Sequence, residues 1–457
     1  MYGEGDVDIL IQGGRVVDPG RDVDRRADVW IRNGVIDEIT DPRPAPEGRR
    51  GLLVIDASEQ IVCPGLVDVH THLRDPGQEE KETIATGALA AVQGGFTSVC
   101  CMANTSPPVD NRALVEYILR TANGVGLARV YPLATVTRGM NGRELTEMAD
   151  LADAGAVAFS DDGKPVMNSA VMRHALEYSR LIDRPIMVHE EDASLTNAAV
   201  MNEGPVATRL GLKGWPGIAE EILIARDLLL LEHTGGRLHL AHVTTAGGVD
   251  LIRRARERGL RFTAEVTPHH LTMTDEWVAG YRPSGNKGIP YDTDTKVNPP
   301  LRTEHDRQAL IEAVRDGTID FISTDHAPHS EVDKLCEYGA AAFGFSGLET
   351  ALGSLLGLVH EGLLDLSVLI RRLTVNAAHA FNLPAGELRP GAPGDICIFD
   401  PGRSWIVDPS KFASKGKNTP LKGQVLRGQV TATICRGRLV YLNKDCRTIV
   451  SGAEVPA

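Results

Sequence analysis

Eight short apolar runs, most of them followed by a stretch with helical periodicity, dominate the middle of the sequence. Strands that alternate with helices form parallel βα units, and a continuous apolar strand indicates burial on both faces. Eight such units in succession predict an α/β fold, a (β/α)8 TIM-like barrel, with an open sheet as the alternative. The runs lie at residues 66–70, 97–102, 129–134, 156–160, 185–189, 238–242, 261–266 and 320–324.

The two ends of the chain have a different sequence pattern, in which short strand candidates are separated by glycine and Asp-Pro turns. They lie at 8–12, 15–17, 28–32 and 35–39, and again at 395–399, 404–407, 423–426, 429–435 and 438–441. Such runs predict β-sheet at both ends, and 457 residues exceed the usual size of a single core. We therefore expect a small β-sandwich domain from residues 1–56 and 386–457, beside a barrel at 57–385.

Composition and charge exclude several classes of protein. A net charge of −13 argues against nucleic acid or an anionic membrane as the main partner. The seven cysteines include no Cys-x-x-Cys pair, which is typical of a reducing compartment without a disulfide framework. The first residues lack the basic and apolar regions of a signal peptide, and the most apolar helical stretch carries Arg226 and Asp227. We expect a cytoplasmic enzyme.

Residues that can perform chemistry gather where the predicted strands end, which is where barrel enzymes hold their sites. His70 and His72 come at the end of the first strand, and residues two apart on a strand face the same way. Imidazole is a common ligand for zinc and related metals, so the pair predicts a metal centre. The other strand ends carry Asn104, Asp161, Asp162, His189, His242 and Asp325.

Four histidines and two aspartates are too many for one tetrahedral zinc ion. They suit two metals about 3.5 Å apart that share a carboxylate and a hydroxide. Such a centre lowers the pKa of bound water to near 7 and polarises a carbonyl oxygen. Asp325 can bind metal and also hold the proton of the hydroxide. The predicted reaction class is metal-assisted hydrolysis of an amide or imide, or its reverse.

Six motifs together resemble class I dihydroorotase, a cyclic amidohydrolase of de novo pyrimidine (UMP) biosynthesis in the amidohydrolase superfamily. The resemblance covers nearly the whole chain, and the first or last motif alone would indicate only the superfamily. The motifs are His-Thr-His-Leu-Arg-Asp-Pro-Gly from residue 70, Lys81-Glu82-Thr83, Asn104-Thr105, Asp161-Asp162-Gly163, Asn298-Pro299-Pro300-Leu301-Arg302 and Asp325-His326-Ala327-Pro328-His329.

The resemblance implies two zinc ions per subunit, bridged by Asp162 and a hydroxide. It assigns three ligands to one zinc and two to the other: His70, His72 and Asp325, then His189 and His242. Many relatives bridge their metals with a carboxylated lysine, so Asp161 or a modified Lys164 remains an alternative to Asp162. The resemblance also implies that the hydroxide attacks the ring amide carbonyl, with Asp325 as the catalytic general acid and base.

The substrates that the resemblance implies, N-carbamoyl-L-aspartate and L-dihydroorotate, carry carboxylates that a guanidinium group recognises bidentately. Arg74 returns to the same face as His72 and is the expected clamp. By resemblance, His72, Asn104, Asn298 and His329 hold the carboxylate and the polar groups of the ring. The backbone at Phe343 and Gly344 is expected to close over the ring.

Several nearby residues have plainer interpretations. We expect His269 and His270 to pack or support the ligands, and His326 to orient Asp325 or the loop rather than to bind metal. The surplus charge of Glu190, Glu191 and Asp192 is expected to be solvated or ion-paired. Two features depart from the family pattern: Ala103 stands where the family usually has proline, and residues 280–296 are longer than usual. That segment is a lid, a partner contact or a surface insertion.

Three functions remain open, of which a zinc-dependent dihydroorotase leads. A hydantoinase or allantoinase is the second, although the rings of their substrates lack the carboxylate that Arg74 would bind. The third is an inert dihydroorotase-like subunit that scaffolds aspartate carbamoyltransferase, although such a subunit should lose ligands that this chain retains. We expect a small-molecule substrate, a homodimer or higher homo-oligomer, and a complex with aspartate carbamoyltransferase as a further partner interaction.

Overall fold

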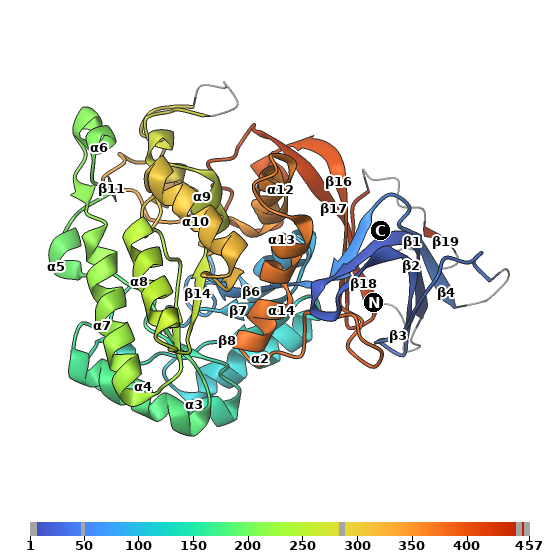
Figure 1. Cartoon of the computed structure of the whole chain (residues 1–457), viewed down its shortest axis with the longest axis horizontal. Coiled ribbons are helices and arrows are strands. Elements are labelled where there is room, and N and C mark those ends of the chain that lie inside the picture. Colours follow the sequence, from blue (N-terminus) through green and yellow to red (C-terminus); the bar gives the residue numbers. More distant parts are fainter. Residues whose placement is uncertain (1–6, 47–50, 283–287, 445–449, 452–457) are drawn as a thin grey trace.

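The computed structural model describes residues 7–46, 51–282, 288–444 and 450–451. A nine-stranded sheet joins the two ends of the chain and lies at one end of the molecule (Figure 1). Its strands follow the order β18 (Arg438–Leu442), β17 (Val425–Cys435), β16 (Ile396–Ile406), β5 (Ile61–Pro64), β1 (Asp8–Asp18), β2 (Val23–Arg32) and β3 (Val35–Thr40). On a branch, β4 (Leu52–Asp56) pairs with β1, and β19 (Val450–Ser451) pairs with β4.

Several strands of this sheet are longer than the sequence predicted. The separate runs at 8–12 and 15–17 form the single strand β1, whose pairing with β2 shifts register between Ile11 and Gly14. Gly13 lies there with a φ of 72°, a conformation that glycine adopts without strain. The runs at 395–399 and 404–407 likewise merge into β16 across an irregularity after Asp400. A β-bulge interrupts the alternation of side chains along a strand, so the sequence at a bulge resembles that of a turn. Strands β4 and β5 were not predicted.

Each of the eight predicted central runs overlaps a strand. A three-stranded parallel sheet has the order β6-β7-β8, and a five-stranded parallel sheet has the order β15-β14-β13-β10-β9. Two isolated parallel bridges, Ala134 with Phe159 and Thr71 with His326, join the edges of these sheets. The strands are β6 (Leu66–Thr71), β7 (Phe96–Cys101), β8 (Arg129–Pro132), β9 (Phe159–Ser160), β10 (Ile186–Val188), β13 (Leu238–Leu240), β14 (Thr263–Val266) and β15 (Phe321–Ile322).

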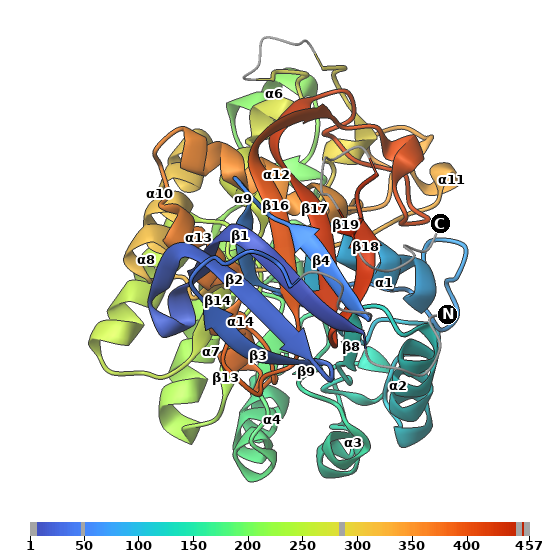
Figure 2. The same ribbon diagram turned by 90° about the vertical axis from the view of Figure 1, so that its right-hand side faces the viewer.

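Helices surround these strands, as the view onto the nine-stranded sheet shows (Figure 2). Their ends follow ordinary capping rules: Asn111 accepts a hydrogen bond from Leu114 N at the start of α2, and Gly126 ends it with a φ of 69°. The helices that follow the central strands or precede the last strands are α1 (Ile84–Gln93), α2 (Arg112–Val125), α3 (Met148–Ala154), α4 (Ser169–Ile182), α7 (Ile218–Thr234), α8 (Ala246–Glu257), α10 (Glu304–Asp316), α12 (Leu348–His360), α13 (Leu366–Leu373) and α14 (Val375–Ala380).

A further excursion between β10 and β13 was not predicted. It holds the short helices α5 (Ala193–Thr196) and α6 (Pro205–Leu210) and a two-stranded parallel ribbon of β11 (Met201–Asn202) and β12 (Gly214–Trp215). The remaining short helices α9 (Pro268–Thr272) and α11 (Glu331–Lys334) follow β14 and β15. Short 3-10 turns lie at Pro19–Arg21, Arg138–Met140, Asp275–Trp277, Thr293–Thr295 and Pro409–Lys411.

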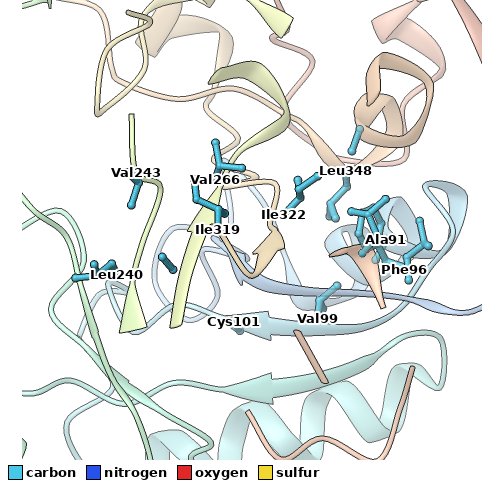
Figure 3. Packing of buried hydrophobic residues seen from close by; sticks show 14 of the residues in the cluster. Ala91, Phe96, Val99, Cys101, Leu240, Val243, Val266, Ile319, Ile322 and Leu348 are labelled. Atoms are coloured by element: carbon cyan, nitrogen blue, oxygen red, sulfur yellow. The ribbon is translucent and has the colours of Figure 1, made fainter. Parts of the chain in front are cut away.

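The main core lies between the central strands and their helices (Figure 3). Val99 of β7, Val266 of β14 and Ile322 of β15 are fully buried there with Ala91 of α1 and Leu348 of α12. Burying each larger aliphatic side chain stabilises the fold by roughly 1.5–3 kcal/mol. This packing holds the strand ends in fixed positions. Within the described residues, no helix combines the length and the apolar character needed to cross a membrane.

Candidate metal centre

Five buried residues from four strand ends converge on one point. They form two groups of potential metal donors that share Asp162, which follows β9. We call His70 and His72 the β6 side, because both come from the end of that strand. We call His189 and His242 the β10–β13 side, because they directly follow the ends of those strands.

The donor atoms are spaced as a tetrahedral metal ion requires. Asp162 Oδ1 lies 3.7 Å from His70 Nε2, 3.4 Å from His189 Nδ1 and 3.4 Å from His242 Nε2, and Asp162 Oδ2 lies 3.5 Å from His72 Nε2. Metal–nitrogen bonds of 2.0–2.1 Å in tetrahedral geometry separate neighbouring donors by roughly 3.3 Å. Among the described residues, His70 Nε2 and Asp162 Oδ1 are buried without a hydrogen-bond partner, which is rare for polar atoms. The donor set therefore fits a metal.

Asp325 joins the β6 side from the end of β15. Its Oδ1 lies 3.0 Å from His72 Nε2 and 3.5 Å from His70 Nε2. Asp325, His242 and Arg74 have φ angles of 49°, 32° and 61°, a left-handed backbone that non-glycine residues seldom adopt. Such strain clusters at functional sites, where the surrounding structure holds it in place.

The electrostatics of the centre favour positive charge. Burial opposes the charged form of Asp162, but the neighbouring imidazoles of His189, His242 and His70 hold the pKa of this carboxyl well below its usual range. Burial likewise lowers the pKa of His189, but Asp162 and Glu191 outweigh it and raise this pKa to about 10. A metal cation competes with protons for the same nitrogen lone pairs, so the surroundings that attract protons also attract a metal.

Two carboxylates contact the ring nitrogens of these histidines that face away from the centre, and the sequence predicted a supporting role for neither. Glu265 on β14 is fully buried and accepts a hydrogen bond of 2.6 Å from His70 Nδ1, while its other oxygen lies 3.3 Å from His239 Nε2. Glu191 Oε2 lies 3.0 Å from His189 Nε2. Carboxylates in this position fix the ring orientation of a metal ligand and raise its basicity. A charged residue inside an apolar strand was the available signal for Glu265.

The predicted substrate residues lie beside the β6 side and on the loops that follow β15. Arg74 is 9% exposed, and its Nη2 lies 3.4 Å from His329 Nε2. His329 donates a 2.7 Å hydrogen bond from Nε2 to Phe343 O. A Cβ atom on Gly344, whose φ is 115°, would lie 2.6 Å from Ala327 Cβ, so only glycine fits there. This packing brings the Phe343–Gly344 backbone to the loop that follows Asp325.

Two predicted amides reach the centre from different directions. Asn104 Oδ1 lies 2.9 Å from His72 Nδ1, from which it accepts a hydrogen bond. Asn298 Nδ2 lies 3.5 Å from Glu191 Oε2, whereas Asn298 Oδ1 is buried and has no hydrogen-bond partner in the described part of the chain. The second amide therefore offers a free acceptor next to the β10–β13 side.

The alternatives to Asp162 lie elsewhere. Asp161 accepts hydrogen bonds from Val136 N at 2.8 Å and from Thr137 N at 3.1 Å, so its carboxylate holds the loop after β8. Lys164 is exposed and lines a cavity together with Asp161 and Glu190. Of the three candidates, the structure brings only Asp162 into the donor groups identified among the described residues.

Three further histidines near the strand ends have partners or packing contacts of their own. His326 Nδ1 accepts from Gly347 N at 3.1 Å, and its Nε2 lies 3.3 Å from Glu82. His270 contacts Thr267 Oγ1 at 2.7 Å and Pro299 O at 3.1 Å. His269 packs edge-on against Phe345. His269 and His270 thus pack beside the site, and His326 contacts the start of α12 and Glu82.

The expectation that Glu190 is solvated or ion-paired is wrong. It is buried, and neither of its oxygens has a hydrogen-bond partner among the residues that the structure describes. The turn after β10 directs it into a cavity that Arg226 and Asp227 also line. Its neighbour Glu191 contacts His189 instead, and Asp192 caps α5 through Ser194 N.

The described parts of the long 280–296 segment pack against neighbouring loops; residues 283–287 lie outside the described residues. Tyr291 Oη donates to Leu210 O at 2.9 Å, at the end of α6. The buried Lys296 donates from Nζ to Gly339 O at 2.9 Å and to Ala341 O at 2.7 Å. The end of the segment thus anchors the loop that leads to Phe343.

Known proteins are similar in sequence to this chain over almost its whole length. The family model described as Dihydro-orotase-like matches residues 59–247, which include both donor groups. A protein of Syntrophus aciditrophicus named Dihydroorotase is 51% identical over 434 residues, which is 95% of this chain and 99% of the relative. A Dihydroorotase of Pelotomaculum thermopropionicum is 50% identical over 440 residues, 96% of this chain and 100% of the relative. The chain belongs to the dihydroorotase family.

Solved structures place this dihydroorotase-family chain in the amidohydrolase fold. The L-hydantoinase (dihydropyrimidinase) of Arthrobacter aurescens matches with a TM-score of 0.81 and 26% identity, over 95% of this chain and 96% of the neighbour. The dihydropyrimidinase of Brevibacillus agri matches with a TM-score of 0.78 and 20% identity, over 96% of each chain. The similarity to this second structure, at 20% identity, shows a shared fold only.

Proposed function

We propose that this chain catalyses the reversible cyclisation of N-carbamoyl-L-aspartate to L-dihydroorotate with loss of water, the dihydroorotase reaction of de novo pyrimidine biosynthesis. The observation that carries this proposal is the pair of donor groups that share Asp162, with the buried Arg74 beside them. Relatives named Dihydroorotase at about half identity over nearly the whole chain support it.

The metal assignment is part of the proposal. His70, His72 and Asp325 would hold one Zn²⁺ and His189 and His242 a second, with Asp162 as a ligand available to both. The spacing of the donor atoms and the unpaired His70 Nε2 support this assignment. Bound zinc supplies Lewis acidity and makes water a nucleophile at neutral pH.

The residues of the chain then have distinct tasks. Arg74 binds the substrate carboxylate, and His72, Asn104, Asn298, His329 and the backbone of Phe343 and Gly344 hold its other polar groups. During cyclisation the ureido nitrogen attacks the carbon of the protonated side-chain carboxyl group, and a C–N bond forms as the C–OH bond breaks. Asp325 takes the proton from this nitrogen and returns it to the departing oxygen, which leaves as water. In the reverse direction the same carboxylate takes a proton from the attacking water.

The finer architecture is also a proposal. The two isolated bridges between the parallel sheets support a closed (β/α)8 barrel at 57–385. A separate core cluster that includes Ile9, Ile31 and Ile398 supports a small β-sandwich domain from residues 1–56 and 386–457, which β5 at the start of the barrel segment also joins. We further propose a cytoplasmic protein that forms at least a homodimer and that associates with aspartate carbamoyltransferase.

The hydantoinase-like fold leaves one competing activity. An L-hydantoinase neighbour shares 26% identity with this chain, and hydantoin lacks the carboxylate of dihydroorotate. The buried guanidinium of Arg74, beside His329, favours a substrate with a negative charge at that position. This observation favours dihydroorotase over hydantoinase.

The test follows carbamoyl-aspartate cyclisation by the purified chain, with the metal content measured on the same sample. Turnover with two zinc ions per chain is the expected result, and Asp325→Asn should lower kcat by about 10²- to 10⁴-fold. Turnover of hydantoin but not of dihydroorotate would overturn the proposal in favour of a hydantoinase. Bound zinc without turnover of either substrate would leave the inert scaffold as the better assignment.

A further inference from the structure

Glu191 lies between the metal centre and the substrate side of the site. It follows β10 by three residues and precedes α5, and its side chain is 13% exposed. Oε1 accepts a hydrogen bond from Thr196 Oγ1, while Oε2 lies 3.0 Å from His189 Nε2 and 3.5 Å from Asn298 Nδ2. One carboxylate oxygen therefore serves a metal-donor residue and a substrate residue at once.

The contact with His189 determines which ring nitrogen is free. A neutral imidazole carries one N–H and one lone pair, and a carboxylate can only accept a hydrogen bond. Glu191 therefore keeps the proton of His189 on Nε2 and leaves the lone pair on Nδ1. Nδ1 is the atom that lies 3.4 Å from Asp162 Oδ1 and 2.9 Å from His242 Nε2. The carboxylate thus prepares the nitrogen that faces the other donors.

The contact with Asn298 determines the orientation of its amide. Only the NH2 group of the amide can donate to Glu191, so Nδ2 is held on the carboxylate. Asn298 Oδ1 is left buried, with no partner in the described ranges. A buried acceptor of this kind costs free energy unless a ligand donates to it. A substrate N–H group, such as those of the ureido group or the dihydroorotate ring, meets that requirement.

We infer that Glu191 is a positioning residue that fixes both the tautomer of His189 and the amide orientation of Asn298. Metal binding on the β10–β13 side and recognition of a substrate N–H then depend on the same carboxylate. Thr196 contributes by holding the other oxygen of this carboxylate. The substrate half of this inference rests on the proposed dihydroorotase function, whereas the metal half does not.

The test compares Glu191→Gln, Glu191→Ala and Glu203→Gln, an exposed control in the same excursion. Zinc per chain is measured against a graded chelator series. Loss of a carboxylate behind a metal ligand weakens metal binding about 10- to 100-fold. We expect Glu191→Ala to lose one zinc in this way and to retain the other. Gln keeps an acceptor for His189, so Glu191→Gln should recover much of the loss, while Glu203→Gln should match wild type.

The second readout is the split between KM and kcat at saturating zinc. We expect Glu191→Ala to raise the KM for carbamoyl-aspartate about tenfold, because Asn298 is free to rotate. Unchanged zinc affinity and unchanged KM would overturn the inference. Equal loss of both zinc ions together with a lower unfolding temperature would also overturn it, since that pattern indicates a merely structural role. If wild type bound zinc but turned over no dihydroorotate, the proposed function would fail, and the chelator series would still decide the metal half.

Discussion

The two sides of the metal centre are built differently. On the β6 side, His70 and His72 come from one strand, two residues apart, and the supporting Glu265 is fully buried. On the β10–β13 side, His189 and His242 follow two different strands, and the supporting Glu191 lies on a loop with a partly exposed side chain. The first pair is set by the alternation of a single strand, and the second by the turns that follow two strands.

This difference has consequences for how firmly each side holds its geometry. Asp68 on β6 accepts hydrogen bonds from His70 N at 3.0 Å and from Thr324 N at 3.1 Å, which ties β6 to the segment that carries Asp325. On the other side, Ala241 N donates to Val188 O at 3.1 Å, while the carboxylate beside His189 is held by the loop contacts of Glu191. Donors that are fixed before binding lose less entropy when a ligand binds. We therefore expect the β6 side to bind its metal more tightly.

Asp162 belongs to both sides, so its removal should have the largest effect. Asp162→Ala takes one donor from each side at once, so we expect at least one metal to be lost and kcat to fall on the order of 10³-fold. Metal content and kcat are measured on the same preparation. Asp161→Asn is the matched control, because Asp161 bonds to the loop after β8. Retention of two metals by Asp162→Ala would reassign the shared ligand.

The second prediction concerns the β6 side alone. Glu265→Ala removes the carboxylate behind His70, and we expect zinc affinity on that side to fall about 10- to 100-fold while the other side is unchanged. Chelator titration gives the affinities, and anomalous diffraction locates the metal that remains. A metal lost from the β10–β13 side instead would contradict the assignment of Glu265 to the β6 side. Comparison with Glu191→Ala shows whether the more deeply buried carboxylate has the larger effect.

The sequence predicted the donors better than the residues behind them. All eight central strands were predicted because buried βα units have a strong apolar pattern, and the donors were then found at the strand ends. Glu265 and Glu191 were missed as supporting residues because their roles depend on which side chains face each other across strands and loops. Glu190 and Glu191 are adjacent, yet Glu190 lines a cavity with Arg226 and Asp227, whereas Glu191 contacts His189 through its carboxylate. The local sequence does not determine which of these two side chains contacts the metal-donor residue.

The small sheet shows the same limit in the fold. The sequence divided β1 into two strands because Gly13 and Gly14 interrupt the alternation, whereas the structure carries the pairing across them. The ribbon of β11 and β12 is only two residues long on each strand, too short for any periodic pattern. Long periodic elements are therefore predictable, and bulges and short ribbons are decided by tertiary pairing.

The third prediction separates substrate binding from both metal sides. Arg74→Lys keeps the positive charge but removes the planar fork that binds a carboxylate bidentately. We expect the KM for carbamoyl-aspartate to rise about tenfold and the zinc content to stay at the wild-type value. Arg143→Lys, at an exposed position after β8, serves as the control. Parallel loss of zinc would mean that Arg74 acts on the β6 donors rather than on the substrate.

The fourth prediction, with the smallest effect on turnover, concerns residues that lie behind the donors of the β6 side. His326, next to Asp325, contacts Glu82, and Glu82 accepts a 2.5 Å hydrogen bond from Ser414 Oγ. Glu349 on α12 holds the same loop by accepting from Ala413 N at 2.8 Å. Burial raises the pKa of Glu349 to about 7, despite the hydrogen bonds from this loop.

The sign of the resulting pH dependence follows from linkage. The folded chain binds the Glu349 proton more tightly than the unfolded chain between pH 4.5 and about pH 7, so this group makes the free energy of unfolding fall as the pH rises through that window. Glu349→Gln cannot titrate and should show a shallower fall, with kcat at neutral pH within about twofold of wild type. Denaturant unfolding of both chains from pH 4.5 to 7.5 measures the difference, and Glu361→Gln, exposed at the end of the same helix, is the control. A difference that grows in the opposite direction would mean that Glu349 is charged in the folded chain throughout this range, and that the β6 side rests on a buried carboxylate rather than on a neutral acid.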